Sequence, residues 1–184
     1  MSLFYTIFTT LPGLLAEFLF TEAQTGYLLS FISLVAVFAA MMMPKIVGKF
    51  SEAIVLMFAF ISYALAHLLF AISTVSEMLI LASVFAGIGF GFSIPLLNHA
   101  TVERSTDKNR GRNLSMFAMA VFMGQFVTSF FEFLPLSPNE TLYVCAAIGA
   151  ICAVVQGLVV KSLVQSNARM TEPGLMPEGY HRAG

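Results

Sequence analysis

Charged residues are scarce in this chain, and their scarcity decides its class. Only 10% of the 184 residues are Asp, Glu, Lys or Arg, while 58% are hydrophobic. An average soluble domain is about 25% charged, so a soluble globular protein is excluded. The nine Lys and Arg residues are also too few and too dispersed to form the accessible basic surface that a nucleic-acid partner requires.

Cysteine is nearly absent as well. Cys145 and Cys152 are the only two, and both lie in one apolar stretch. On a helix their spacing separates them by about 10 Å, whereas a disulfide needs Cα atoms within roughly 7 Å. We therefore expect two free, apolar cysteines.

The N-terminus lacks the features of a cleavable signal peptide. No basic segment precedes its first apolar stretch, and that stretch ends in Glu17 and Glu22 without a small-residue cleavage site. The first apolar stretch is therefore expected to stay in the mature protein.

What the sequence does have is long apolar runs. A membrane-spanning helix needs roughly 20 mostly apolar residues. The sequence predicts an all-α membrane protein whose six transmembrane helices cover residues 4–20, 27–43, 53–72, 78–97, 113–134 and 141–163. Pro44 is expected to help end the second helix. Residues 1–165 would form one bundle, and the polar residues 166–184 a disordered cytoplasmic tail.

The basic residues follow the predicted topology. With six crossings, all of them fall on one side of the membrane, while the opposite connections carry only acids, namely Glu22, Glu77 and Glu140. Cytoplasmic loops hold the excess of Lys and Arg, so a multi-pass protein with both termini in the cytoplasm is predicted.

Two predicted spans carry polar stripes. Residues 113–134 include Gln125, Thr128, Ser129 and Glu132 at helical spacing, and residues 4–20 include Tyr5, Thr6, Thr9 and Thr10. A polar stripe in a span faces protein or water, so it either lines a water-filled cavity or forms hydrogen bonds between helices. Asn98, at an inner helix end, either caps the helix or reaches the cavity.

Acids are missing from the middle of every predicted span. Glu17 and Glu132 lie near outer helix ends, either simply at the interface or as a cation-attracting pair at an outer mouth. A central carboxylate would be the clearest sign of proton coupling. His67 is the one ionisable residue deep in a span, and beside Tyr63 it is expected to be neutral and hydrogen-bonded. The three histidines lie on different elements, so neither a metal site nor another cofactor is expected.

Small residues concentrate in the fourth predicted helix. Gly87 and Gly91 are four residues apart, a pattern typical of tight helix packing in lipid, and Pro95 offers a point of bending. Ser93 raises the alternative of an intramembrane serine protease. The residue after it is not the glycine such a nucleophile needs, and no histidine has an obvious partner role, so an enzyme is not expected.

Three segments resemble the major facilitator superfamily. Residues 87–98, GIGFGFSIPLLN, resemble helix 10 of bacterial drug-efflux members. Residues 110–112 and 124–126 are similar to the family's entry into helix 11, and residues 5–12 to the start of helix 7. The inner loop, residues 44–50, lacks the Asp and Arg of the family's loop signature. The resemblance covers residues 3–163.

The resemblance implies half of a transporter. Family members have two six-helix halves with the substrate site between them, and this chain resembles the C-terminal half, of which the first, second, fourth and fifth helices would line the cavity. The implied protein sits in the bacterial cytoplasmic (inner) membrane and exports a small organic solute or drug in exchange for protons. The candidate substrate-binding residues are Tyr5, Thr9, Asn98, Gln125, Ser129 and Glu132.

The partner of this bundle is left open by the sequence. A second six-helix bundle would be either an N-terminal half or another copy of the chain. Only Met1 and Ser2 precede the first apolar stretch, as expected for a cut between halves. The alternatives are a half-transporter acting as a dimer, and a truncated, non-transporting membrane fragment or interaction subunit.

Overall fold

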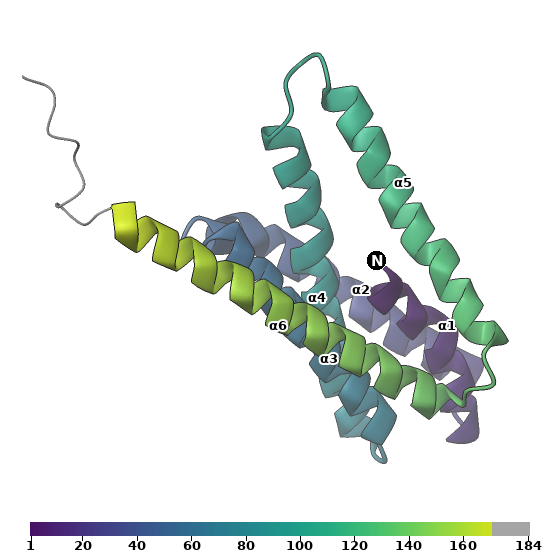
Figure 1. The fold of residues 1–184 in the computed structure, drawn as a ribbon. Helices are drawn as coiled ribbons and strands as arrows, with labels where there is room; N and C mark the ends of the chain where they lie inside the picture. Colours follow the sequence, from purple (N-terminus) through teal and green to yellow (C-terminus); the bar gives the residue numbers. More distant parts are fainter. Residues whose placement is uncertain (171–184) are drawn as a thin grey trace, which may run out of the picture.

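The computed structural model describes residues 1–170, apart from the side chains of Glu132 and residues 167–170. Within this range all regular structure is helical, which confirms the all-α prediction (Figure 1). The elements are α1 (Ser2–Glu17), α2 (Glu22–Val47), α3 (Glu52–Ile72), α4 (Ser76–Glu103), α5 (Arg110–Ser129), the 3-10 turn η1 (Phe130–Phe133) and α6 (Pro138–Met170). The part of the predicted tail from residue 171 onward lies outside the described residues.

Several helices extend beyond their predicted ends. The prediction that Pro44 helps to end the second helix was wrong, because α2 continues through Pro44 to Val47. Helix α4 likewise runs past Asn98 to Glu103, and α6 continues to Met170, five residues beyond the predicted end of the bundle at residue 165. Apolar runs mark where a helix leaves hydrocarbon, whereas the backbone stays helical into the polar interface.

Four helices are long and apolar enough to cross a membrane: α2, α3, α4 and α6. Helix α1 has 16 residues, a length of about 24 Å against roughly 30 Å of hydrocarbon. Helix α5 begins with Arg110, Arg112 and Asn113, so its apolar part is shorter than its 20 residues. The chain is thus a multi-pass membrane protein, and the crossings by α1 and α5 stay predictions.

Helix α4 lies at the centre of the packing. Helix α2 packs on one of its faces and α3 on another, and α3 also packs along α6 (Figure 1). A Cβ atom on Gly87 would lie 2.6 Å from the Val35 Cβ, and one on Gly91 would lie 2.6 Å from the Ala39 Cβ. Small residues therefore let the backbones of α2 and α4 approach closely, which confirms the predicted tight packing.

Helix α5 is attached less extensively. Thr128 is its only buried residue among the described side chains, and the helix leans away from α4 in Figure 1. Its contact with α1 is close, because the Ser2 hydroxyl donates to the Gly124 carbonyl at 2.8 Å. The start of α1 thus lies beside the C-terminal half of α5.

Reciprocal caps begin two helices at the predicted outer face. At α2, Gln24 N–H donates to the Thr21 hydroxyl at 3.3 Å, and Thr21 N–H donates to the Gln24 side chain at 2.9 Å. At α6, Glu140 N–H donates to the Ser137 hydroxyl at 3.3 Å, and Ser137 N–H donates to the Glu140 carboxylate at 2.7 Å. These caps satisfy backbone donors that the first turn of a helix leaves free.

The close approach of α2 and α4 predicts a position-specific cost for adding a methyl group. Gly91→Ala should lower the free energy of unfolding in detergent by roughly 1–3 kcal/mol, because the new Cβ would overlap α2. Thermal unfolding followed by circular dichroism measures the effect. Gly26→Ala is the matched control, since a Cβ there meets nothing within 4 Å, and it should leave stability unchanged or raise it. Equal stabilities of the two variants would contradict the packing.

Candidate functional site

A cavity of about 330 Å³ opens between α1, α2 and α4. The α2 residues that line it lie near the middle of that helix, and the α4 residues near the middle of theirs. The lining residues are Phe4, Phe8, Ser33, Ala36, Val37, Ala40, Phe90, Gly91 and Pro95. We call this space the aromatic cavity.

Phenylalanine rings form one wall of the aromatic cavity. Phe4 stacks on Phe90 with ring centroids 3.8 Å apart and an angle of 20° between the planes. Phe8, one turn along α1, lies 4.8 Å from Phe4 between centroids. Helix α2 contributes the small side chains of Ala36 and Ala40 to the lining. The cavity is therefore lined by aromatic rings from α1 and α4 and by small apolar side chains from α2.

Hydrogen-bonding capacity in the aromatic cavity is low. Ser33 is the one lining residue with a polar side chain, and its hydroxyl donates to the Leu29 carbonyl at 3.1 Å. Three stretches that contribute lining residues contain no Asp, Glu, Lys or Arg, namely residues 2–16, 23–44 and 78–98. The cavity walls are thus uncharged.

The polar stripe predicted on α1 lies away from the aromatic cavity. Thr9 lines a separate cavity of about 240 Å³ together with Thr10, Gly13 and residues of η1 and the start of α6. The Thr9 hydroxyl donates to the Thr6 carbonyl at 3.2 Å. Tyr5 is exposed, although its neighbour Phe4 is buried. Tyr5 and Thr9 therefore follow a different face of α1 from that of Phe4 and Phe8.

The predicted residues of α5 and α4 are spread along the bundle. Gln125 is half-buried and Ser129 exposed, each next to a residue of α5 that touches α1. Glu132 lies in η1, and its side chain is not described. Asn98 is exposed near the inner end of α4. Among the described side chains, no hydrogen bond joins any two of the six predicted residues, and their role stays a prediction.

At Thr128, the polar stripe of α5 forms hydrogen bonds between helices, which is one of the two alternatives that the sequence left open. Its hydroxyl is buried and lies 3.0 Å from the Gly124 carbonyl and 3.4 Å from the Ser2 carbonyl of α1. This residue therefore connects helices and does not line a cavity.

Two buried side chains of α3 make hydrogen bonds inside the bundle, although the His67 Nε2 is buried without a partner among the described residues. The Tyr63 hydroxyl lies 3.2 Å from the Ser93 hydroxyl of α4. The His67 Nδ1–H donates to the Tyr63 carbonyl at 2.7 Å, as expected for a hydrogen-bonded helix histidine. Ser93 is only 5% exposed, so a serine nucleophile at this position would have no access to a substrate.

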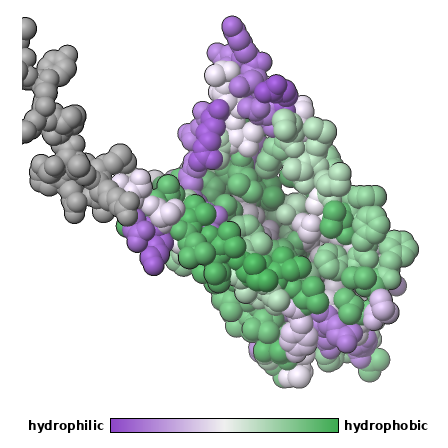
Figure 2. Space-filling model, in the orientation of Figure 1, coloured by the Kyte–Doolittle hydropathy of each residue, from purple (hydrophilic) through white to green (hydrophobic). Residues whose placement is uncertain are grey.

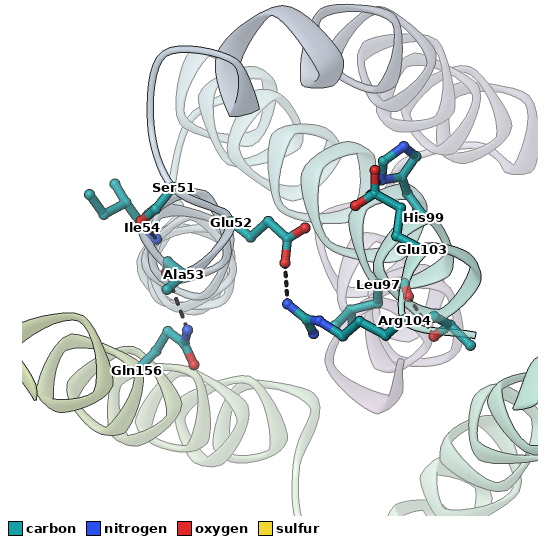
Figure 3. A network of polar contacts seen from close by, with 10 residues as sticks. Ser51, Glu52, Ala53, Ile54, Leu97, His99, Glu103, Arg104 and Gln156 are labelled. Atoms are coloured by element: carbon teal, nitrogen blue, oxygen red, sulfur yellow. Dashed lines mark hydrogen bonds and ion pairs between the residues drawn. The ribbon is translucent and has the colours of Figure 1, made fainter. Parts of the chain in front are cut away.

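Polar contacts between helices gather at the predicted inner face (Figure 3). The Arg104 guanidinium of α4 donates to the Glu52 carboxylate of α3. The Gln156 amide of α6 donates to the Ala53 carbonyl at 3.2 Å. These contacts therefore tie α3 to both α4 and α6.

The same face gathers the described residues that could hold a cation. One ligand atom each from Glu52, His99 and Glu103 lies within 4.8 Å of the others. The sequence alone does not indicate this group, because Glu52 lies on a different helix from His99 and Glu103 and far from them along the chain. Arg104 already neutralises Glu52, and both His99 and Glu103 are exposed. We therefore assign the group to these polar surface contacts.

Polar residues lie mainly at the ends of the molecule. Figure 2 shows hydrophilic residues gathered at the tip that holds the α4–α5 loop, with a largely hydrophobic surface between the ends. Long apolar helices and polar ends define an integral membrane protein, with an apolar cavity between three of its helices.

Residues 1–176 match the Major Facilitator Superfamily, and the chain belongs to this family. Members of the family are membrane transporters and not enzymes, so the function of the chain is membrane transport in this general sense. No curated protein and no solved structure matches the chain.

The Tyr63–Ser93 contact predicts coupling between α3 and α4. Tyr63→Phe and Ser93→Ala should each lower the free energy of unfolding, by about 0.6–1.7 kcal/mol for an interhelical hydrogen bond. The double variant should lose less than the sum, because the second change removes a bond that is already broken. Unfolding in mixed detergent micelles measures all three. Ser162→Ala, at an exposed serine, is the control, and strictly additive losses would contradict the hydrogen bond.

Proposed function

We propose that the chain is the C-terminal six-helix half of a bacterial efflux transporter that exports small organic solutes by alternating access. The observation that carries this proposal is the family match over residues 1–176. The segments that resemble drug-efflux members, residues 5–12, 87–98, 110–112 and 124–126, support the finer assignment.

In the proposed mechanism this bundle rocks against a second six-helix bundle around a site near the membrane midplane. Helices α1, α2, α4 and α5 would face that site. The aromatic cavity supports this assignment, because it lies at mid-height and opens between three of these four helices. The second bundle is either an N-terminal half or another copy of the chain.

The predicted polar residues supply the hydrogen bonds of the proposed site. Tyr5, Thr9, Gln125 and Ser129 would contact polar atoms of the solute along α1 and α5. Asn98 would meet it at the inner mouth and Glu132 at the outer mouth. Exchange for protons needs a titratable group near the midplane. Because residues 78–98 and 113–131 contain no acid, we assign the coupling carboxylate to the second bundle.

Charge supports the proposed orientation in the inner membrane. The Arg104–Glu52 pair lies where the α2–α3 and α4–α5 connections meet. These connections and the helix ends next to them hold six of the nine basic residues: Lys45, Lys49, Arg104, Lys108, Arg110 and Arg112. An excess of Lys and Arg marks the cytoplasmic side, so six crossings would leave both termini there.

Proton-coupled export predicts solute uptake by inverted membrane vesicles. Inside-out vesicles that contain the chain and its partner bundle should accumulate an exported organic solute when a proton gradient is applied, and a protonophore should abolish the accumulation. Gln125→Ala should raise the KM roughly two- to tenfold, as expected for the loss of one hydrogen bond. Initial uptake rates at several solute concentrations measure the effect.

The matched control is Gln165→Ala, at an exposed position near the end of α6, which should transport at the wild-type rate. Accumulation that ignores the protonophore would contradict proton exchange. Equal accumulation with and without the chain would favour the alternative of a non-transporting fragment or interaction subunit.

The need for a second bundle predicts a crosslinked complex. Lysine-directed crosslinking in native membranes should yield a species larger than the 20.0 kDa chain, since a site between halves needs a second bundle. Mass spectrometry of the crosslinked band distinguishes a second copy from another six-helix chain. An exclusively monomeric product would contradict the half-transporter.

A further inference from the structure

The aromatic cavity has a size and a chemistry that select among organic solutes. Its volume of about 330 Å³ is roughly twice that of an engineered apolar cavity of about 150 Å³ that binds benzene in another protein. It therefore has room for a two-ring aromatic group. The stacked pair of Phe4 and Phe90, with Phe8 beside it, supplies ring faces against which such a group can pack.

Charge on the ligand is disfavoured by the same walls. A buried ion without a counter-charge costs several kcal/mol even after relaxation of the protein. The cavity lining contains no charged side chain, and the Ser33 hydroxyl already donates to a backbone carbonyl. Attraction of a cation to a phenylalanine face recovers only about 0.5–2 kcal/mol. The balance favours a neutral ligand over a lipophilic cation.

Position separates the aromatic cavity from a second apolar cavity of similar size. That cavity, of about 340 Å³, is lined by residues at the outer ends of α2 and α4, including Tyr27, Leu28 and Leu79. The aromatic cavity is instead lined from Ser33 to Ala40 on α2 and from Phe90 to Pro95 on α4, near the middle of each helix. Substrate sites of alternating-access transporters lie near the bilayer midplane, which favours the aromatic cavity over the outer one.

We infer that the aromatic cavity binds an uncharged, planar aromatic group of about two fused rings, held against Phe4, Phe8 and Phe90. The inference rests on the proposed function for its role in transport, and it names the substrate class of that site. Polar contacts from α1 and α5 would hold the remainder of the solute, whereas the ring system would lie between α1, α2 and α4.

The test compares three naphthalene probes of matched size on the full chain in lipid nanodiscs at pH 7. Radiolabelled 2-naphthol is neutral, 2-naphthyl-trimethylammonium is a cation and naphthalene-2-sulfonate is an anion. Saturable binding of 2-naphthol is expected, with little competition from either ion. Tighter binding of the cation than of 2-naphthol would overturn the inference.

Two variants locate the binding. Phe8→Leu keeps an apolar side chain but removes a ring face, and it should weaken 2-naphthol binding roughly two- to tenfold. Val37→Trp adds a large ring at an exposed lining position without truncating the core, and it should abolish saturable binding. Phe58→Leu, on an exposed face of α3, is the control and should bind like the wild type. Wild-type binding by both cavity variants would overturn the inference.

A third variant tests whether the absence of charge in the cavity lining causes the preference for a neutral ligand. Ser33→Asp places a carboxylate at the cavity wall, so 2-naphthol binding should fall and binding of 2-naphthyl-trimethylammonium should appear. An unchanged preference in this variant would overturn the assignment of the binding site to this cavity.

Failure of the inference and failure of the proposed function give different results. If vesicles transport organic solutes but the cavity variants bind 2-naphthol like the wild type, transport stands and the cavity assignment falls. If the cavity variants lose 2-naphthol binding but vesicles transport nothing, the binding site stands and the proposed function falls.

Discussion

The close approach of α2 to α4 at Gly87 and Gly91 is the contact on which most of the bundle depends. Apolar surface gives helices no reason to associate in lipid, so association needs van der Waals contact between backbones and interhelical hydrogen bonds. The missing side chains at these glycines bring Val35 and Ala39 against the α4 backbone. The same approach places the middle of α2 beside the middle of α4, where the aromatic cavity opens.

The packing has the outline of two three-helix units. If α1–α3 and α4–α6 are the two units, α2 and α5 are equivalent helices. Helix α2 packs on α4, α5 packs on α1, and α3 and α6 pack on each other. In the first contact glycines of α4 admit α2, and in the second Gly124 of α5 admits the start of α1. Repeats of three helices are found within the six-helix halves of major facilitator transporters. The second contact is less extensive, and α5 is held by similarly few contacts with α1 and with α4.

Charge and cavity are separated along the membrane axis. The ion pair between Arg104 and Glu52 lies at one end, where solvent reduces the cost of charge. The aromatic cavity is lined by stretches of α1, α2 and α4 that contain no Asp, Glu, Lys or Arg, near the middle of α2 and α4. This separation follows from the high cost of a charge in hydrocarbon. It leaves aromatic rings and small apolar side chains as most of the surface that a solute would meet in the aromatic cavity.

The sequence by itself determined the class of the protein and the glycine face on which its fourth predicted helix packs closely, whereas the structure identified α2 as the partner. Long apolar runs exclude a soluble globular protein, and glycines at helical spacing predict close packing of helices. The helix ends predicted near Pro44 and Asn98 were wrong, because α2 and α4 continue beyond them. Hydropathy marks the edge of the bilayer, whereas the helical backbone hydrogen bonds continue past it. Only the tertiary structure decided that Phe4, Phe8 and Phe90 meet at one cavity. Lipid and an apolar cavity are equally hydrophobic surroundings, so a phenylalanine that faces one cannot be distinguished in the sequence from a phenylalanine that faces the other.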